Sequence, residues 1–397
     1  EEAPILIASI PELPPRDKPC HVTTNGTYEG SFIRTGDGDR KLSHYEIDRL
    51  IEERSQPRHD ARIVEGATEE DLDDALVEAL VERERFLHPR VFEKFGKRDI
   101  LKALRVLDED ERGILRPTLA GLLALGIYPQ KYFPRLTVSF AAYPGTTKAT
   151  LAETGQRFLD SGDFVGPIPV MIAEAVAAVA KNTRTGSFFE GAFREDVPDY
   201  PQEAVREAVA NALMHRDYSP EAWGTQVQVN LYADRLEILN PGGLYGSVTV
   251  DTLGTLGLSS SRNEFLSKIL GSTPYPQTPG KARYVVENKG SGYAEIASRL
   301  AAAYMEPPKP HDRPGSSLTL CKRRPTLGKQ HDYSSGNIEN AILAMATEYD
   351  TVSAKEVEEA SRLSRGTVLK HINNLIRQGL LEATEPGSSR KKLTHPQ

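Results

Sequence analysis

The sequence predicts a multi-domain α+β protein, and three observations lead to this fold class. A chain of 397 residues is long enough for roughly two to four domains with separate cores. Its content of 39% hydrophobic and 26% charged residues is typical of an ordinary globular protein. Strand-like alternation and helical periodicity are interleaved along most of the chain, whereas residues 334–397 form a self-contained helical pattern with a terminal hairpin.

The N-terminal part, residues 1–55, combines strand patterns with one helix. Residues 4–10 and 28–35 alternate well enough for two strands, and a glycine-rich turn follows the second. Ser43 is placed to cap the helix that comes next. We therefore expect a small α/β element at this end of the chain.

Residues 56–160 are predicted to form a helical and α/β connector. It begins with a polar stretch at residues 54–68, and leucines at four-residue steps then indicate a helix. The following long helix precedes the segment that carries the candidate site. The segments expected here are helices at 69–85 and 99–106, a leucine-rich stretch at 116–126 and a buried strand at 135–142, and the long helix at 166–182 belongs to the module that follows.

The stretch that follows Tyr200 contains the strongest functional signal. Its apolar residues recur at helical spacing, and Glu207 and Asn211 lie four residues apart, so their polar ends share one face of the helix. A carboxylate and a carboxamide one turn apart can hold a water molecule and a hard divalent ion beside a phosphate. Such a pair alone is more often a solvated helix face.

Two glycine turns strengthen this interpretation. Asn240-Pro241-Gly242-Gly243 follows a predicted strand pair, and its backbone amides could approach an anion. Gly290-Ser291-Gly292 opens a further helix, an arrangement that tolerates phosphate through the amides and the helix dipole. We expect the helix and both turns to meet around one cavity.

These residues resemble the C-terminal module of the RecG-related transcriptional regulators, also called the divergent AAA family. That module is itself similar to the GHKL-type ATP-binding fold of gyrase, Hsp90 and histidine kinases. The resemblance implies a GHKL-like α/β sandwich over residues 161–325, with Glu207 as general base and Asn211 as magnesium ligand. It implies ATP as the ligand, bound with Mg near both glycine turns, at Asn240, Gly242, Gly243, Gly290 and Gly292.

The sequence departs from the GHKL pattern at both glycine turns. Asn240 stands where the superfamily normally has an aspartate that receives the adenine amino group. The second turn has one glycine pair followed by Tyr293, where a longer glycine ladder is usual. These departures favour nucleotide binding over hydrolysis, so at most a weak ATPase is expected.

The resemblance extends to the parts before this module. The KPCHV, YEGSFIRTGDG and LSHYEIDRLIEE segments resemble the closing part of a Schlafen-type AlbA domain, which implies a nucleic-acid-binding remnant over residues 1–55. The RPTLAGLLALG segment and the residues after it resemble the connector of the same regulators.

The C-terminal unit, residues 334–397, follows a linker at 326–333. Its pattern predicts three helices, the second capped by Ser353 and the third by Ser364, and then a hairpin that pairs residues 380–383 with 391–394. Val368, Ile372, Leu375 and Ile376 would make the inner stripe of the third helix. This pattern predicts a winged helix-turn-helix and resembles those of bacterial transcription regulators.

DNA is the expected partner of this unit. The third helix would enter the major groove with Arg365, Thr367, Lys370 and His371, and the wing would bring the basic residues Arg390, Lys391 and Lys392 near the backbone. A homodimer is the usual partner of a palindromic site. The alternative is a dimerisation or docking module.

Composition and motif spacing exclude other classes. The three Gly-Lys pairs are followed by Arg98, Ala282 and Gln330, so the helicase P-loop is absent. His215-Arg216-Asp217 lacks the downstream asparagine of a kinase loop. We expect a structural role for it, in which Asp217 bonds turn amides and Arg216 pairs with a carboxylate.

Charge, cysteine content and hydropathy indicate the cellular compartment and the kind of nucleic-acid binding to expect. The net charge of −7 argues against a protein that binds nucleic acid over its whole surface. Two cysteines outside any metal-ligand spacing suit the cytoplasm, and no run approaches the roughly 18 apolar residues that cross a membrane. The opening Glu-Glu-Ala-Pro resembles no signal peptide, and we expect the natural chain to extend further upstream.

Together these observations predict a cytoplasmic DNA-binding transcriptional regulator with a nucleotide-sensing module. Two alternatives remain open. One is a weak Mg-dependent ATPase that uses Glu207 as its base. The other is an interaction scaffold whose nucleotide pocket has degenerated.

Overall fold

The computed structural model describes two compact units, one formed by Glu1–Thr185 with Pro198–Lys322 and the other by Gly186–Val197 with Arg323–Gln397. Within them the described residues are 13–35, 38–152, 154–183, 185–190, 193–255, 260–276, 284–286, 290–303, 305–312, 315–323, 338–349, 352–361, 363–378, 380–383 and 392–394. The predicted α+β class with several units is confirmed.

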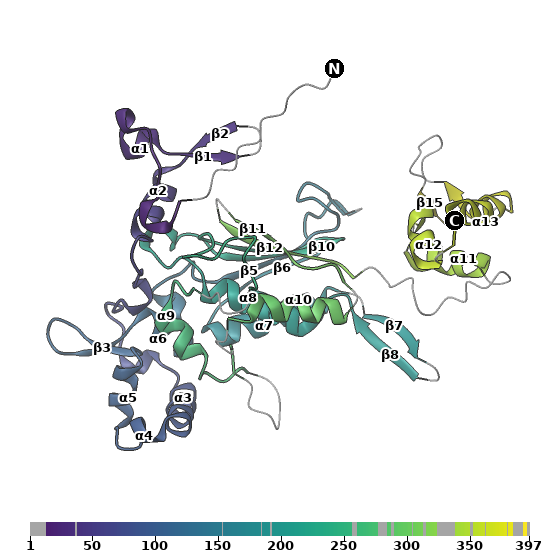
Figure 1. Cartoon of the computed structure of the whole chain (residues 1–397). Helices are drawn as coiled ribbons and strands as arrows, with labels where there is room; N and C mark the ends of the chain where they lie inside the picture. Colours follow the sequence, from purple (N-terminus) through teal and green to yellow (C-terminus); the bar gives the residue numbers. More distant parts are fainter. Residues whose placement is uncertain are drawn as a thin grey trace. The chain divides into compact units, whose positions relative to one another are not determined.

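A six-stranded mixed sheet forms the centre of the first unit (Figure 1). Its order is β11-β12-β10-β9-β5-β6, and every neighbouring pair is antiparallel except β5 and β9, which run parallel. Strands β5 and β10 alternate buried and half-buried residues, as expected for a sheet with one packed face. Their bounds are β5 Val138–Ala142, β6 Asp160–Phe164, β9 Val227–Leu231, β10 Arg235–Asn240, β11 Lys309–His311 and β12 Ser316–Cys321.

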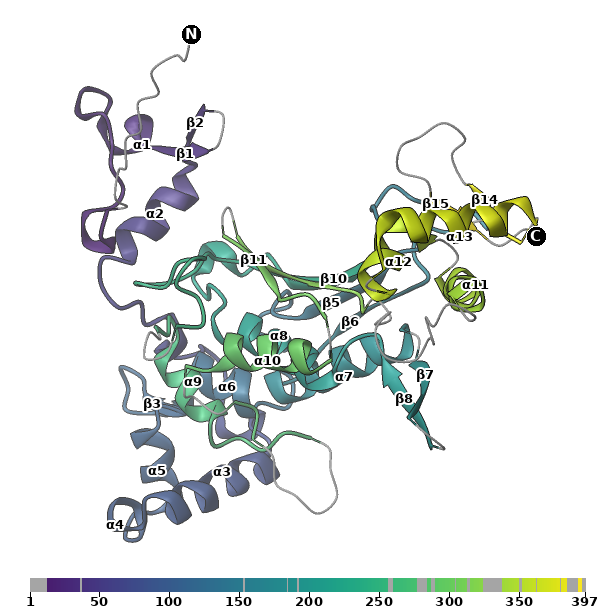
Figure 2. The same ribbon diagram turned by 45° about the vertical axis from the view of Figure 1, so that its right-hand side comes forward.

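Three helices cover one face of this sheet, as Figures 1 and 2 show: α7 (Ile168–Lys181), α8 (Gln202–Met214) and α10 (Gly292–Ala302). α8 lies between the other two and packs on β9 and β10. The apolar stripe predicted for it is confirmed, because Val205, Val209 and Leu213 are buried. The polar residues Glu207 and Asn211 lie on another side of α8, which borders the site.

A helical layer joins the same core. It contains α3 (Asp74–Leu87), α4 (Pro89–Phe92), α5 (Lys97–Ala103), the hairpin β3 (Leu107–Glu109) and β4 (Leu115–Pro117), α6 (Leu119–Leu125) and α9 (Glu264–Leu270). Every residue of α6 is buried, which explains its run of leucine and alanine. One hydrophobic cluster extends from Val64 to Leu320, so the core has no break at the expected boundary between residues 160 and 161.

The N-terminal element has α1 (Gly26–Gly30), β1 (Phe32–Thr35), β2 (Gly38–Lys41) and α2 (His44–Glu52), with a small core of its own. The predicted cap is confirmed, because the Ser43 hydroxyl accepts from the Glu46 N–H and the Glu46 carboxylate accepts from the Ser43 N–H. The strand predicted at 28–35 is wrong in its first half. There, a turn closed by the Ser31 hydroxyl donating to the Thr27 carbonyl overrides the alternation. The strand predicted at 4–10 lies outside the described residues.

Short 3₁₀ helices complete the first unit at η1 (Pro15–Asp17), η2 (Thr23–Asn25), η3 (His59–Ala61), η4 (Glu69–Asp71), η5 (Pro129–Lys131) and η6 (Pro220–Ala222). None of the helices in the described ranges is both long and apolar enough to cross a bilayer.

The second unit contains the hairpin of β7 (Thr185–Glu190) and β8 (Phe193–Pro198), and the predicted C-terminal elements. These are α11 (Ile338–Tyr349), β13 (Val352–Ser353), α12 (Ala354–Ser361), α13 (Arg365–Arg377), β14 (Glu382–Ala383) and β15 (Lys392–Thr394), with sheet order β13-β15-β14. The inner stripe of α13 is confirmed, with Val368, Ile372 and Leu375 buried. The hairpin that pairs β14 with β15 lies where the sequence predicts it. Its assignment to the winged-helix class stays a prediction.

Candidate functional site

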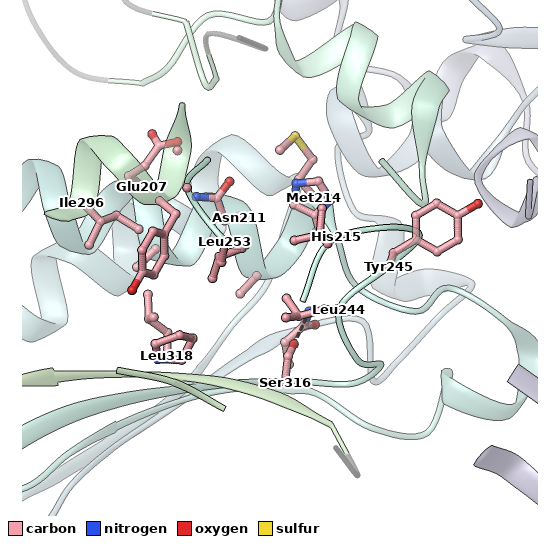
Figure 3. Close-up of a pocket in the computed structure, with 18 of the residues that line it drawn as sticks. Glu207, Asn211, Met214, His215, Leu244, Tyr245, Leu253, Ile296, Ser316 and Leu318 are labelled. Atoms are coloured by element: carbon pink, nitrogen blue, oxygen red, sulfur yellow. Dashed lines mark hydrogen bonds between the residues drawn. The ribbon is translucent and has the colours of Figure 1, made fainter. Parts of the chain in front are cut away.

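A cavity of about 280 Å³ lies between α8, the strands β10 and β12, and the start of α10. Figure 3 shows Glu207, Asn211 and His215 along the helical side, with Ser316 and Leu318 on the sheet side. Polar and aliphatic groups both line the cavity. Its lining includes Glu207, Asn211, His215, Asn240, Gly243, Leu244, Tyr245, Leu253, Val286, Gly290, Gly292, Tyr293, Ile296, His311, Ser316 and Leu318.

The structure brings α8 and both glycine turns together, as the sequence predicts. Glu207, Asn211, Asn240, Gly243, Gly290 and Gly292 all line this cavity. The first turn follows the buried end of β10, and the second leads directly into α10. Segments far apart in the sequence therefore meet at one site.

Gly292, the first residue of α10, lies directly against the polar face of α8. A Cβ at this position would lie 2.6 Å from Asn211 Nδ2 and 2.8 Å from Glu207 Oε1. Real side chains essentially never make contacts this close, so only glycine fits without displacing Asn211 and Glu207. The absence of a side chain lets the backbone at the start of α10 approach both polar groups.

Gly242 differs from the other predicted site residues, because it is absent from the described lining of the cavity. Its φ of +95° requires glycine or strain, and a Cβ there would lie 2.8 Å from Asp217 Cβ. The α-carbon of Gly242 thus faces the 215–217 segment behind the turn. Its role in ligand contact stays a prediction, whereas its role in shaping the turn is visible.

Asn240 ends β10 and is 8% exposed. The amide orientation that satisfies both of its atoms has Nδ2 donating to the Ala212 carbonyl at 3.0 Å. Its oxygen then faces the Ser316 hydroxyl, which is paired with Asn240 across the sheet. The carboxamide therefore offers an acceptor at the floor of the cavity.

Glu207 is also 8% exposed and has a cation beside it. Arg206 Nη2 lies 3.2 Å from Glu207 Oε2, and the same guanidinium donates to the Val285 carbonyl at 2.8 Å. The carboxylate therefore lies at the wall of the cavity with a guanidinium beside it, a geometry that suits a charged group that positions a ligand.

His215 is a cavity residue that the sequence reasoning treated only as part of a structural turn. It follows Asn211 by four residues at the end of α8, and this spacing was the signal that could have placed it on the same face. Burial, with a smaller effect of the Arg262 charge, lowers the pKa of His215 to about 4. The ring is therefore neutral at pH 7.

The 216–217 segment is structural, and one of its two predicted contacts is confirmed. Asp217 Oδ1 accepts from the Ser219 N–H at 2.8 Å. The predicted pairing of Arg216 with a carboxylate is wrong: among the described residues, this buried guanidinium donates to the carbonyls of Ala222 and Thr225. The reason is that η6 turns its carbonyls toward the buried arginine.

The candidate DNA-binding residues of α13 differ in their surroundings. Arg365 and Lys370 are exposed, whereas Thr367 lies near the Ser364 cap. His371 Nδ1 lies 3.1 Å from Glu339 Oε1 of α11, which ties this ring to the neighbouring helix. Arg390 and Lys391 lie outside the described residues, and for Lys392 the structure describes only its place in β15.

Comparisons with known proteins support part of the predicted relationship. Residues 224–320 match the family described as "Putative ATP-dependent DNA helicase recG C-terminal". Residues 48–139 match a family described as "Domain of unknown function (DUF8451)". Residues 224–320 are thus similar to an ATPase-like RecG C-terminal domain, and this range includes both glycine turns but begins after Glu207 and Asn211.

One solved structure, the DIP2311 protein from Corynebacterium diphtheriae, is similar at 17% identity over 93% of this chain and 70% of that chain, with a TM-score of 0.48. No curated protein sequence matches the chain. The regulator, AlbA-type and winged-helix assignments have no counterpart in these matches and stay predictions.

Proposed function

We propose that the cavity beside α8 binds an adenine nucleotide together with Mg, and that the protein is a DNA-binding transcriptional regulator that uses this module as its sensor. The observation that carries the proposal is the close approach of Gly292 to Glu207 and Asn211. It brings a helix start, a carboxylate and a carboxamide together, which are the groups that hold a phosphate and its metal ion.

The residues present fit a magnesium nucleotide. The Asn211 and Glu207 oxygens are hard ligands of the kind that Mg prefers. Among the described residues, no three His, Cys, Asp or Glu side chains gather as a metal site, so the ion would take its other ligands from phosphate and water. When bound, Mg neutralises phosphate charge, and the backbone around Gly290 and Gly292 would hold the phosphates.

The aliphatic lining of the cavity suits a flat base. Leu244, Leu253, Ile296 and Leu318 supply aliphatic walls, and Asn240 supplies an acceptor for an exocyclic amino group. Ligand sites commonly combine such apolar walls with a few convergent polar groups. This arrangement supports a nucleotide over a small inorganic anion.

Binding without efficient turnover is the favoured outcome. The departures from the GHKL pattern at both glycine turns, with Asn240 in place of the usual aspartate and Tyr293 directly after the glycine pair, favour binding over hydrolysis. A weak ATPase that uses Glu207 is the second candidate, favoured by the match of residues 224–320.

The DNA-binding proposal concerns the C-terminal unit. Exposed Arg365 and Lys370 lie in the first half of α13, where a recognition helix contacts bases and phosphates. Thr367 and the wing residues Arg390, Lys391 and Lys392 would add to that contact, whereas His371 would serve mainly to brace α13 against α11. A docking module remains the alternative for this unit.

The nucleotide proposal is tested by titrating the full chain with Mg and a labelled, non-hydrolysable ATP analogue. We expect the analogue to bind the wild type and Glu203→Gln, a variant one turn earlier on α8, and not to bind Asn211→Ala. No binding to the wild type leaves the scaffold alternative. ATP turnover that disappears in Glu207→Gln but persists in Glu203→Gln would favour the enzyme.

The DNA proposal is tested by the salt dependence of DNA binding. We expect a double Arg365→Ala/Lys370→Ala change to abolish retention and lower the salt slope. A Lys355→Ala/Arg377→Ala variant removes the same charge from exposed positions on α12 and at the last residue of α13, away from its first half, and serves as the control. Equal retention by both variants would contradict groove contact through α13.

A further inference from the structure

The N-terminal helix α2 is bonded to the back of the turn that lines the cavity. Arg262, 4% exposed, links them: its Nη2 lies 2.6 Å from Glu53 Oε1 just beyond α2 and donates to the Gly243 carbonyl at 3.1 Å. Its Nη1 donates to the His215 carbonyl at 3.2 Å. One buried guanidinium therefore holds α2, the glycine turn and the end of α8.

Asp217 makes a second link of the same kind. Its Oδ2 accepts from the Tyr45 hydroxyl of α2 at 2.6 Å, and its N–H donates to the Pro241 carbonyl at 2.9 Å. Burial favours the neutral acid, but the Tyr45 and Ser219 hydrogen bonds and the Arg262 charge outweigh it and lower the pKa of Asp217. The carboxylate is therefore charged at neutral pH.

A third link reaches the cavity lining itself. The Tyr245 hydroxyl donates to Gln56 Oε1 at 3.0 Å, and Gln56 Nε2 donates to the Arg262 carbonyl at 3.0 Å. Tyr245 lines the cavity, whereas Gln56 follows α2 and is outside the described lining. The three links share the turn from Pro241 to Tyr245.

We propose that Arg262 is a positioning residue for this turn, and that it couples occupancy of the cavity to docking of α2. A ligand that fixes the turn strengthens the docking of α2. A weaker α2 contact lowers the affinity for the ligand by the same factor, because coupling free energies are reciprocal. The inference rests on the proposed function for the identity of the ligand. The coupling would carry the effect of ligand binding to the N-terminal element, because α2 belongs to that element.

The matched pair Tyr45→Phe and Tyr28→Phe tests this coupling. Each change removes one phenol-to-aspartate hydrogen bond of 2.6 Å that involves the N-terminal element: Tyr45 bonds Asp217 behind the turn, whereas Tyr28 bonds Asp48 within the element. Glu53→Gln is a second variant that weakens the link to Arg262.

The readouts are amide hydrogen exchange of residues 44–53 and 242–246 in the full chain, and affinity for the Mg complex of a non-hydrolysable ATP analogue. In the wild type the analogue should slow exchange in α2. Tyr45→Phe should speed exchange of the turn without ligand, weaken binding by roughly three- to tenfold, and lose the protection of α2. Tyr28→Phe should leave all three unchanged.

The outcomes separate the two proposals. If the analogue does not bind the wild type while Tyr45→Phe and Glu53→Gln still speed exchange of the turn, the ligand assignment fails and the positioning role stands. If both variants bind the analogue like the wild type and the turn exchanges at the wild-type rate, the coupling is overturned. A loss of affinity in Tyr28→Phe equal to that in Tyr45→Phe would also overturn it, because the effect would then be general.

Discussion

Gly292→Ala is the change that examines the cavity most locally. The added methyl group would lie 2.6 Å from Asn211 Nδ2, 2.8 Å from Glu207 Oε1 and 2.9 Å from Asn211 Oδ1. All three atoms are ends of side chains that can rotate, so the clash is relieved by moving Asn211 and Glu207 and not the backbone. The helical backbone of residue 292 accepts alanine, which has the better helix propensity by up to about 1 kcal/mol.

We therefore expect Gly292→Ala to keep its free energy of unfolding within about 1 kcal/mol of the wild type. Its affinity for a magnesium nucleotide should fall by about tenfold or more, which corresponds to at least about 1.4 kcal/mol. Denaturant unfolding and equilibrium titration measure the two quantities. Gly224→Ala is the control, because a Cβ there meets no atom within 4 Å.

Two results would contradict the expected role of Gly292 at the cavity. Unchanged nucleotide affinity would mean that Gly292 does not border the ligand. A large loss of stability would mean that Gly292 contacts Asn211 and Glu207 as rigid core packing.

Three further predictions concern the fold around the site. His215 takes its proton in the unfolded chain near pH 6.5 and in the folded chain near 4, so stability should fall by about 1 to 3 kcal/mol as the pH drops between these values. The lower figure applies where water in the cavity solvates the ring. Urea unfolding of His215→Gln should show a weaker dependence of stability on pH than the wild type. An equal pH dependence would contradict this role of His215. The hydrogen bonds from Arg40 lower the pKa of Glu46 to about 2, so its stabilising effect is complete above about pH 4.5 and lost as the pH falls through 2. Glu46→Gln should therefore flatten the acid side of the stability curve and cost up to about 1 kcal/mol at pH 7 through the lost ion pair with Arg40, and an unaltered acid limb would argue against this. Leu122→Ala in the buried helix α6 should lower the free energy of unfolding by about 2 to 5 kcal/mol in urea, and a loss below 1 would show that α6 is not part of the main core.

Local patterns were sufficient to predict several elements of this fold. The stripe of Val205, Val209 and Leu213 places α8 on the sheet, and its bounds agree with the periodicity. The caps at Ser43 and Ser364 begin their helices as expected, because a side-chain acceptor there satisfies N–H groups that the helix leaves unpaired.

Long-range pairing could not be predicted in the same way. β5 lies in the segment expected to be a connector, yet it runs parallel to β9 with Val138 opposite Val227. Nothing in either strand specifies that partner, because register across nearly ninety residues of chain is decided by the shared core. The boundary between connector and module stays a prediction, and in the packing β5 joins the same sheet as β9.

The candidate site shows the same division. Glu207, Asn211 and the glycine turns follow from spacing and from the special backbone freedom of glycine. Ser316 enters the cavity only because β12 pairs with β10, and no local signal marks it. Arg216 was assigned a carboxylate partner by charge, but burial beside η6 gives it carbonyls.

The most direct measurement is photolabelling of the full chain with 8-azido-ATP and Mg, followed by mapping of the labelled peptides. We expect label in the segments around residues 238–254 or 310–318, which contribute to the lining of the cavity, and loss of that label when unlabelled ATP competes. Label confined to other segments, or label that ATP does not displace, would contradict the assignment of this cavity as the nucleotide site.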